Sequence, residues 1–228
     1  MTDEAEDRTF AGATGAQRRF ALAPGMRQII LVRHGSSVGA TVDTIELGPL
    51  SISDPVLSLD GEVQAQAVGA ALARTAISAV FVTPLRRTRQ TAAPLVQATG
   101  LQPQVIDDLR EVHMGDFEHT FYEHAHARNP LIARMFAEER WDVIPNAEPV
   151  DDFAERVRRG MAHLLDGVGE GETSVLFSHA GTIAEICRQA TQSRRFAFTG
   201  VENASISRLL VNPDGSWKLR TFNEVAHL

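Results

Sequence analysis

Residues 28–35 have the sequence QIILVRHG, in which an apolar run leads directly into Arg33, His34 and Gly35. An uninterrupted apolar run of this length, rich in β-branched residues, is typical of a strand that is buried on both faces of a sheet. Ligands of parallel sheets bind beyond the carboxyl ends of the strands. We therefore expect Arg33 and His34 to lie at the functional edge of a sheet.

Two further apolar runs also end in polar residues. Residues 79–82 (AVFV) precede Thr83, and residues 174–177 (SVLF) precede Ser178 and His179. Helical patterns alternate with these runs, which predicts an α/β fold with a mostly parallel central sheet and helices on both faces. The turn sequence NPDG at 212–215 predicts an antiparallel pair of strands near 204–211 and 216–223. The polar ends of the three apolar runs should meet at one edge of this sheet.

Capping residues predict where several helices begin. Thr83 followed by Pro84 is typical of an N-cap and a first helical residue, and Pro94 should kink or restart that helix. Helices that begin directly after His34 and His179 would direct backbone amides and positive dipole ends towards an anion.

Composition excludes several classes of protein. The formal net charge of -7 over 228 residues argues against a general nucleic-acid binder, which needs clustered Lys and Arg. No apolar segment reaches membrane-spanning length, so we expect no membrane partner. The single cysteine, Cys187, permits no internal disulfide, and a reducing cytoplasm is the default location. Residues 1–25 lack apolar periodicity and predict a mobile tail, with residues 26–228 forming one domain and residues 119–150 a small helical cap.

The residues at the predicted sheet edge suit phosphoryl chemistry. A guanidinium group can grip two oxygens of a phosphoryl group, and Arg33 and Arg87 are the candidates. A neutral imidazole, such as that of His34, can attack phosphorus near pH 7 without a metal or cofactor. The leaving oxygen needs a proton, for which Glu111 is the first candidate and Asp116 and Glu118 are its rivals.

The sequence resembles the histidine phosphatase superfamily, which includes the cofactor-dependent phosphoglycerate mutases. The resemblance extends in order from about residue 28 to residue 210. It is carried by LVRHG at 31–35, LSLDG at 57–61, TPLRRTRQTA at 83–92, LREVHMGDFE at 109–118, SHAG at 178–181 and NASI at 203–206. It implies a three-layer phosphoglycerate mutase-like fold and places 26–228 in a single histidine phosphatase domain of the phosphatase branch.

The resemblance also implies a role for each matching residue. His34 is the nucleophile, Glu111 carries the acid, and His179 contacts the phosphate without attacking it. Arg33 and Arg87 bind phosphate, with Arg87 rather than its neighbours Arg86 and Arg89 in the family's arginine position. Ser37 falls where the family often has Thr or Ser in the phosphate-binding loop.

Several positions depart from the family pattern. Ser36 replaces an acidic or amide residue, Ala40 replaces an asparagine, and Ala180 replaces a glycine whose loss is expected to crowd the backbone beside His179. Residues 42–54 lack the usual glycine-containing substrate loop. These departures concern the strength of phosphate binding and the identity of the substrate.

Three functions fit these observations. The first is hydrolysis of small phosphomonoesters through a phosphohistidine, with a small phosphorylated substrate and inorganic phosphate as product. The second is a mutase-type phosphoryl transfer, and the third is a catalytically weak phosphate-binding or interaction module. The sequence is also compatible with a homodimer.

Other charged and aromatic residues have structural interpretations. The isolated histidines His113, His119, His124, His126 and His163 have no partners at metal-ligand spacing. Arg156, Arg158 and Arg159 are expected on a solvated helix face. Trp141 is expected to pack within the cap.

Overall fold

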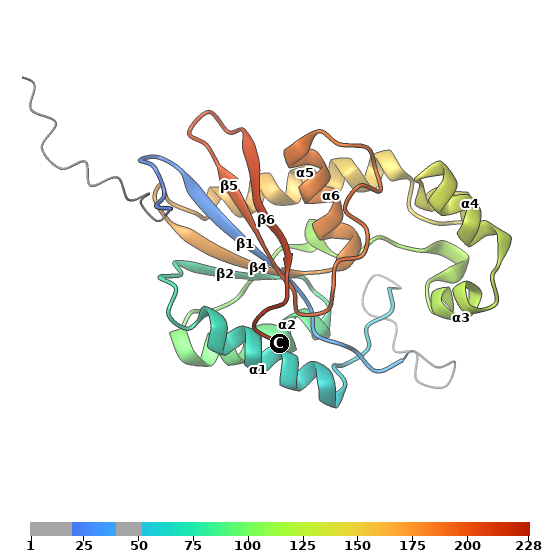
Figure 1. The fold of residues 1–228 in the computed structure, drawn as a ribbon, viewed down its shortest axis with the longest axis horizontal. Coiled ribbons are helices and arrows are strands. Elements are labelled where there is room, and N and C mark those ends of the chain that lie inside the picture. The colour runs from blue at the N-terminus through green and yellow to red at the C-terminus, as the bar shows by residue number, and fades with distance from the viewer. Residues whose placement is uncertain (1–19, 40–51) are drawn as a thin grey trace, which may run out of the picture.

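A six-stranded sheet crosses the centre of the part of the chain that the structure describes (Figure 1). The structure is a computed structural model, and it describes residues 20–39 and 52–228. The strand order is β3-β2-β4-β1-β5-β6. The strands are β1 (Arg27–Arg33), β2 (Ala79–Val82), β3 (Gln104–Val105), β4 (Thr173–Ser178), β5 (Ile206–Val211) and β6 (Trp217–Glu224).

The sheet is mostly parallel, as the alternation of strands and helices predicts. Strands β3, β2, β4 and β1 run parallel, whereas β5 is antiparallel to β1 and β6 is antiparallel to β5. The late antiparallel pair was predicted from the turn at 212–215, and β5 and β6 lie close to the expected ranges. The two-residue strand β3 has no apolar run and was not predicted.

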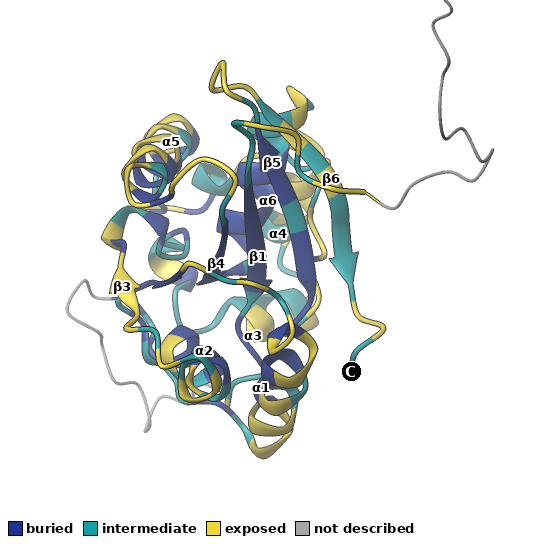
Figure 2. Cartoon of the chain, turned by 90° about the vertical axis from the view of Figure 1, so that its left-hand side faces the viewer, coloured by how far each residue is buried: buried dark blue, intermediate teal, exposed yellow. Residues whose placement is uncertain are grey.

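Helices cover both faces of the sheet and complete three layers. Figures 1 and 2 show α1 and α2 on one face and α5 and α6 on the other. Helices α3 and α4 extend away from the sheet, within the segment predicted as a cap. The helices are α1 (Leu59–Leu72), α2 (Arg86–Thr99), α3 (Phe121–His126), α4 (Pro130–Glu138), α5 (Val150–Asp166) and α6 (Ala180–Thr191), with short 3-10 turns η1 (Asp107–Leu109), η2 (Gly115–Phe117) and η3 (Trp141–Val143).

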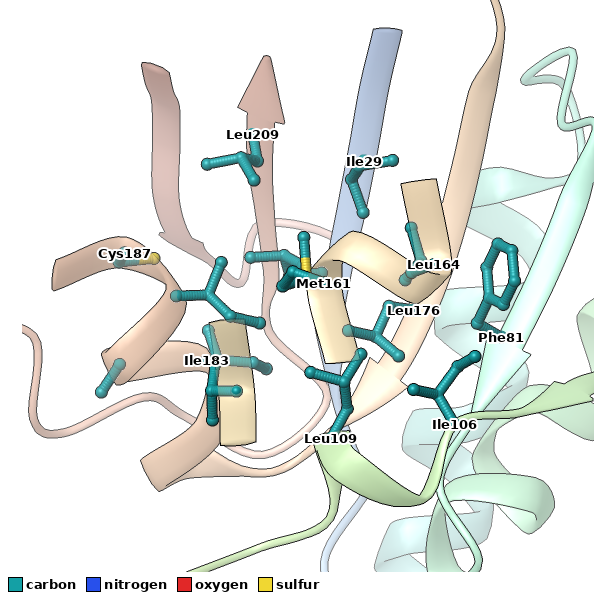
Figure 3. Close-up of a cluster of buried hydrophobic side chains, with 14 of the residues drawn as sticks. Ile29, Phe81, Ile106, Leu109, Met161, Leu164, Leu176, Ile183, Cys187 and Leu209 are labelled. Carbon is teal, nitrogen blue, oxygen red and sulfur yellow. The ribbon is translucent and has the colours of Figure 1, made fainter. Parts of the chain in front are cut away.

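Two hydrophobic layers explain why β1 is apolar along its whole length. Ile29 and Leu31 face the cluster that is formed with α5 and α6 (Figure 3), whereas Ile30 and Val32 face the cluster formed with α1 and α2. All of these residues are at most 1% exposed. Burial of an aliphatic side chain contributes about 1.5–3 kcal/mol, so both faces of β1 stabilise its central place in the sheet.

The start of α2 differs from the sequence prediction. The helix begins at Arg86, and its N-cap is Leu85, which makes no side-chain capping bond. The hydroxyl of Thr83 lies before the cap, where it accepts from the amide of Leu85 at 3.4 Å and contacts the ring of His179 and the hydroxyl of Thr88.

Helix α2 also continues through Pro94 to Thr99. At Pro94 the helix packs closely against α1, since a Cβ atom at Gly69 of α1 would lie 2.7 Å from the Cβ of Pro94. The helix therefore does not restart at Pro94, which was one of the two predicted outcomes.

No helix begins directly after His34, contrary to the sequence prediction. Residues 34–39 form an irregular segment. The amide of Gly35 donates to Thr91 Oγ1 at 3.0 Å, and the amide of Ser36 donates to Gln64 Oε1 at 2.8 Å. This segment runs against the start of α1 so closely that a Cβ at Gly35 would lie 2.6 Å from the carbonyl oxygen of Gly61. Side chains of α1 and α2 therefore accept from the amides that were expected to face an anion.

Candidate active site

The carboxyl ends of β1, β2 and β4 bring the predicted histidines together. Register across the sheet pairs Arg33 with Ser178, so the next residues of β1 and β4, His34 and His179, emerge side by side. Their ring centroids are 5.3 Å apart and the ring planes are inclined by 60°. Both residues are buried. The structure thus joins two of the polar strand ends that the sequence identified.

The hydrogen bonding of His34 fixes which ring nitrogen is available for attack. Its Nδ1 lies 2.8 Å from the carbonyl oxygen of Gly35. A carbonyl oxygen can only accept, so Nδ1 carries the hydrogen and the neutral ring has its lone pair on Nε2. The main-chain oxygen of His34 accepts from Asn203 Nδ2 at 3.0 Å and from the amide of Ala204 at 3.2 Å. Asn203, which the sequence placed in a motif without a role, thereby holds the backbone of His34.

The surroundings of His34 keep its imidazole neutral. Burial lowers its pKa well below the ordinary value of 6.5, and the nearby positive charges of Arg87 and Arg33 lower it further. A neutral imidazole with a lone pair on Nε2 is the nucleophilic form.

His179 is held differently, at the N-cap of α6. Its Nε2 lies 2.9 Å from Thr83 Oγ1, whereas its buried Nδ1 has no hydrogen-bond partner within residues 20–39 and 52–228. Burial lowers its pKa well below 6.5, followed by the charges of Arg87 and His34. His179 therefore joins the ends of β4 and β2 as a neutral ring.

Arg87 is the arginine of α2 that lies within the site. It is 6% exposed and donates to the carbonyl oxygen of Ser53 at 2.8 Å, with Asp54 Oδ1 3.9 Å away. Its pKa is lowered by burial, while the negative charges of Glu111, Asp54 and Glu118 act in the opposite direction. The charge of this buried guanidinium is therefore felt by two of the three acid candidates, Glu111 and Glu118.

The other arginines are placed as follows. Arg86 binds Asp54 from a partly exposed position, and Arg89 is exposed. Arg33 donates to the carbonyl oxygen of Val201 at 2.5 Å, and its buried Nε has no hydrogen-bond partner among the residues described. Arg87 and Arg33 therefore both contribute positive charge near His34.

The carboxylate of Glu111 lies at the N-terminus of α6. Its two oxygens accept from the amides of Gly181 and Thr182, both at 3.2 Å, and Oε1 also accepts from Val112 at 3.0 Å. A helix N-terminus favours a negative group at this place. The expected amide donors after His179 therefore exist, but they bind the candidate acid.

The two rival acids are placed differently. Asp116 is exposed and accepts from Asn146 at 2.8 Å. Glu118 accepts from the amides of Met114 at 2.6 Å and Ser53 at 3.1 Å, and burial raises its pKa. Glu118 thus anchors backbone near Arg87, while Glu111 lies beside the helix that begins after His179.

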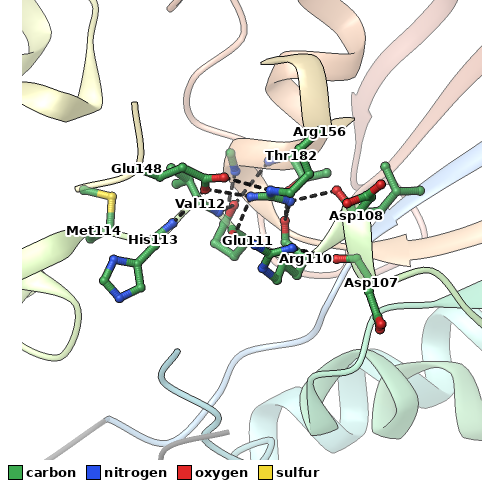
Figure 4. A network of polar contacts seen from close by, with 12 residues as sticks. Asp107, Asp108, Arg110, Glu111, Val112, His113, Met114, Glu148, Arg156 and Thr182 are labelled. Atoms are coloured by element: carbon green, nitrogen blue, oxygen red, sulfur yellow. Dashed lines mark hydrogen bonds and ion pairs between the residues drawn. The ribbon is translucent and has the colours of Figure 1, made fainter. Parts of the chain in front are cut away.

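Arg156 is buried, so its prediction as part of a solvated helix face is wrong. It is 4% exposed, and it binds Glu148 and main-chain oxygens of the segment that carries Glu111 (Figure 4). Its neighbours Arg158 and Arg159 are exposed as predicted. The sequence held one signal that separates Arg156 from its exposed neighbours. Arg156 lies three residues after Phe153 and therefore on the buried face of α5.

Some of the positions that depart from the family pattern lie within the described residues. Ser37 forms an isolated antiparallel bridge with Leu57. Ala180 begins α6, and its φ is not positive, so this position does not require glycine. Ala40 and residues 42–51 of the predicted substrate segment lie outside the described residues.

The remaining sequence predictions concern metals, membranes and the cap. No group of three or more potential metal ligands from His, Cys, Asp and Glu occurs in the described ranges. The helices of residues 20–39 and 52–228 include none with the length and apolar character to cross a membrane. Trp141 packs against Phe196, with ring centroids 4.5 Å apart, and His124 stacks on Phe117.

A cavity of about 450 Å³ lies between α5, α6 and the segment after α6. Apolar and aromatic residues line it together with arginines and acids, among them Trp141, Phe153, Phe196, Arg188 and Glu185. Gly181 also lines it, and the amide of the same residue donates to Glu111.

Comparison of the sequence with known families and proteins agrees with this geometry. The sequence profile of the histidine phosphatase superfamily (branch 1) matches residues 29–225. Phosphoglycerate mutase-like protein 4 of Arabidopsis thaliana is 29% identical over 205 residues, covering 88% of this chain and 86% of that protein. A bifunctional protein of Mycobacterium tuberculosis is 30% identical over 230 residues, covering 98% of this chain, which spans 59% of the length of that relative.

Solved structures share the fold. A mycobacterial glucosyl-3-phosphoglycerate phosphatase superposes with a TM-score of 0.71 at 26% identity, covering 88% of this chain and all of that one. A phosphoglycerate mutase of Bacillus anthracis superposes with a TM-score of 0.73 at 18% identity, covering 90% of this chain and 96% of that one. The second likeness concerns the fold alone.

Proposed function

Because the chain belongs to the histidine phosphatase superfamily, we propose that it hydrolyses small phosphomonoesters through a phosphohistidine at His34. The observation that carries this proposal is the state of His34. Its ring is buried, neutral and hydrogen-bonded through Nδ1, which leaves Nε2 to attack phosphorus beside two arginines.

In the first step of the proposed reaction, Nε2 of His34 forms a bond to phosphorus. The bond between phosphorus and the ester oxygen breaks, and the electron pair goes to the leaving oxygen. Glu111 in its protonated form gives that oxygen a proton, so the alcohol leaves as a neutral molecule. The ring keeps its hydrogen on Nδ1, where it donates to the carbonyl oxygen of Gly35, so the phosphorylated ring is positively charged and this charge offsets the negative charge of the phosphoryl group.

In the second step, water attacks the phosphohistidine. Glu111, now ionised, takes a proton from the water, and the bond between phosphorus and Nε2 breaks. The electron pair returns to His34, and inorganic phosphate leaves. Both steps transfer a phosphoryl group, and its negative charge needs stabilisation in the transition state.

The phosphoryl group would be bound by Arg33, Arg87, His179 and Ser37. Arg33 and His179 each present a buried nitrogen without a protein hydrogen-bond partner in the described ranges, which suits them to contact phosphoryl oxygens. Their positive and polar groups offset repulsion between the phosphate and its surroundings.

The similar proteins support the hydrolase over the alternatives. The structurally similar glucosyl-3-phosphoglycerate phosphatase, at 26% identity, is also known in complex with inorganic phosphate. Mutase-type transfer remains the alternative, because some relatives are named as probable phosphoglycerate mutases. A weak phosphate-binding module remains the third candidate, because Ala40 and Ala180 depart from the family pattern.

The proposal is tested by measuring release of inorganic phosphate from p-nitrophenyl phosphate and trapping the phosphoprotein by rapid quench. His34→Ala should remove the acid-labile phosphoprotein and lower kcat by about a thousandfold or more. The matched control is His163→Ala, which removes an exposed histidine of α5 and should leave both readouts unchanged. Equal activity in His34→Ala would reject the proposal.

A panel of phosphorylated metabolites, assayed with and without a bisphosphate primer, separates the hydrolase from a mutase. The proposed hydrolase releases phosphate without the primer. Isomerised product that forms only when the primer is present would establish the mutase, and phosphate binding without turnover would establish the binding module.

A further inference from the structure

Arg156 makes five hydrogen bonds from a buried position in α5 (Figure 4). Its Nε and one terminal nitrogen donate to the two carboxylate oxygens of Glu148 at 2.8 and 2.7 Å. Its terminal nitrogens also donate to the main-chain oxygens of Asp108 at 2.7 Å, Arg110 at 3.1 Å and Glu111 at 3.3 Å. One guanidinium group therefore holds the backbone on both sides of Arg110 and at the candidate acid itself.

Other bonds tie the same segment to the elements that carry His179. The main-chain oxygen of Leu109 accepts from Ser178 Oγ at 2.9 Å, and that of Arg110 accepts from Thr182 Oγ1 at 2.8 Å. The segment is thus fixed between the end of β4 and the start of α6 on one side and Arg156 on the other.

Glu148 fixes the segment beyond Glu111. Its amide donates to the main-chain oxygen of His113 at 2.9 Å, and its Oε2 accepts from the amide of His113 at 3.2 Å. Arg156 and Glu148 together therefore hold main-chain groups before, at and after Glu111, while the carboxylate of Glu111 is left to the amides of Gly181 and Thr182.

We propose that the Arg156–Glu148 pair is a positioning device for Glu111, which holds the carboxyl group of Glu111 where its protonated form can give a proton to the leaving oxygen. This inference rests on the proposed phosphatase function. The planar guanidinium supplies several donors in a fixed geometry, which the single ammonium group of lysine cannot reproduce. Arg156→Lys therefore keeps the positive charge but cannot make the hydrogen bonds to Glu148 and to the backbone at the same time.

The test compares two substrates that differ in their need for an acid. p-Nitrophenolate leaves readily without a proton, whereas the alkoxide of a primary alkyl phosphate such as glycerol phosphate does not. A misplaced Glu111 should therefore affect the alkyl ester far more. In Arg156→Lys, we expect kcat to fall about tenfold or more for glycerol phosphate and less than about threefold for p-nitrophenyl phosphate, because general acid catalysis contributes about 10²–10⁴-fold.

A double-mutant cycle with Glu111→Gln shows whether Arg156 acts through the acid. Glu111→Gln alone should also select against the alkyl ester. Adding Arg156→Lys to that variant should produce no further loss for the alkyl ester, since the acid is already absent. Additive losses would overturn the proposal.

The matched control is Arg158→Lys, which makes the same change on the same helix at an exposed residue paired with Glu155. It should leave the ratio of the two kcat values unchanged. If Arg156→Lys fails to fold, Glu148→Gln provides the second variant, because it keeps the side-chain size and removes the charge that Arg156 grips. The same larger fall in kcat for glycerol phosphate than for p-nitrophenyl phosphate is expected.

Two failures can be distinguished. A wild-type protein that hydrolyses neither ester would reject the proposed function, and this role with it. An active wild-type protein whose Arg156→Lys or Glu148→Gln variant loses equal activity towards both esters would reject the positioning role alone.

Discussion

Oγ1 of Thr83 lies 2.9 Å from Nε2 of His179, which links the ends of β2 and β4 beside the paired histidines. Both residues are fully buried. The same hydroxyl lies 3.1 Å from Oγ1 of Thr88. The contact fixes the orientation of His179, whose Nδ1 has no hydrogen-bond partner among the described residues.

Thr83→Val should therefore destabilise the protein by about 1–3 kcal/mol, because it leaves a buried imidazole nitrogen without a partner while preserving the shape of the side chain. Urea unfolding measures the change. Thr191→Val, at the exposed end of α6, is the control and should change the free energy of unfolding by less than about 0.5 kcal/mol. Equal changes in the free energy of unfolding for the two substitutions would show that the contact with His179 does not stabilise the fold.

The buried histidines should make stability depend on pH. The pKa of His34 and of His179 lies well below 6.5 in the folded chain, so the unfolded chain binds more protons between the folded values and about pH 6.5. The free energy of unfolding should fall as pH is lowered through this range and should be fully retained above it. Urea unfolding at pH 7.5, 6.0 and 5.0 measures this. His179→Gln should give a shallower dependence, and a slope identical to that of the wild type would contradict the prediction.

Arg87 should dominate binding of inorganic phosphate. Arg87→Lys keeps the charge but loses the planar grip on two oxygens, so we expect affinity to fall about tenfold or more, in line with about 1.5–3 kcal/mol for hydrogen bonds to charged groups. Isothermal titration calorimetry with inorganic phosphate measures the change. Arg89→Lys, an exposed arginine of the same helix, is the control. An equal loss in both variants would mean that general surface charge, rather than Arg87, binds the anion.

Gly181 should be needed for the position of Glu111. A Cβ atom at Gly181 would lie 2.7 Å from Glu111 Oε1. Gly181→Ala should therefore displace the carboxylate and lower kcat for a primary alkyl phosphate by about tenfold or more, although alanine favours a helix over glycine by about 1 kcal/mol. Steady-state kinetics and thermal unfolding together measure both effects. Gly167→Ala, which would make an ordinary 3.4 Å contact with Phe81, should leave kcat unchanged.

Much of the fold and the placement of the histidines could be predicted because their signals are local. The apolar run at 29–32 is continuous because β1 is covered on both faces, and the polar residues follow directly where the strand ends. Parallel pairing then brings His34 and His179 together. The resemblance singled out Arg87, which is the buried arginine of its cluster.

Other features depend on packing between distant segments and left no local signal. In the sequence Thr83 looks like a helix cap, whereas in the structure its hydroxyl lies beside the ring of His179, the N-cap residue of α6. In the sequence Arg156 looks like part of an exposed charged face. In the structure it is buried and donates to the main-chain oxygens of Asp108 and Glu111. The catalytic and phosphate-binding roles remain predictions for all six residues, which are His34, His179, Glu111, Arg33, Arg87 and Ser37.

The place of β4 between β1 and β2 has a consequence for how the chain acquires activity. The two strands synthesised first are never neighbours, and β4 must insert between them before either can complete its pairing. A chain emerging from the ribosome would therefore carry His34 and Arg87 long before residues 173–178 arrive to bring His179 beside them. Catalytic competence should appear late and abruptly during folding, since closing such long loops precedes the contacts that compensate for their entropy.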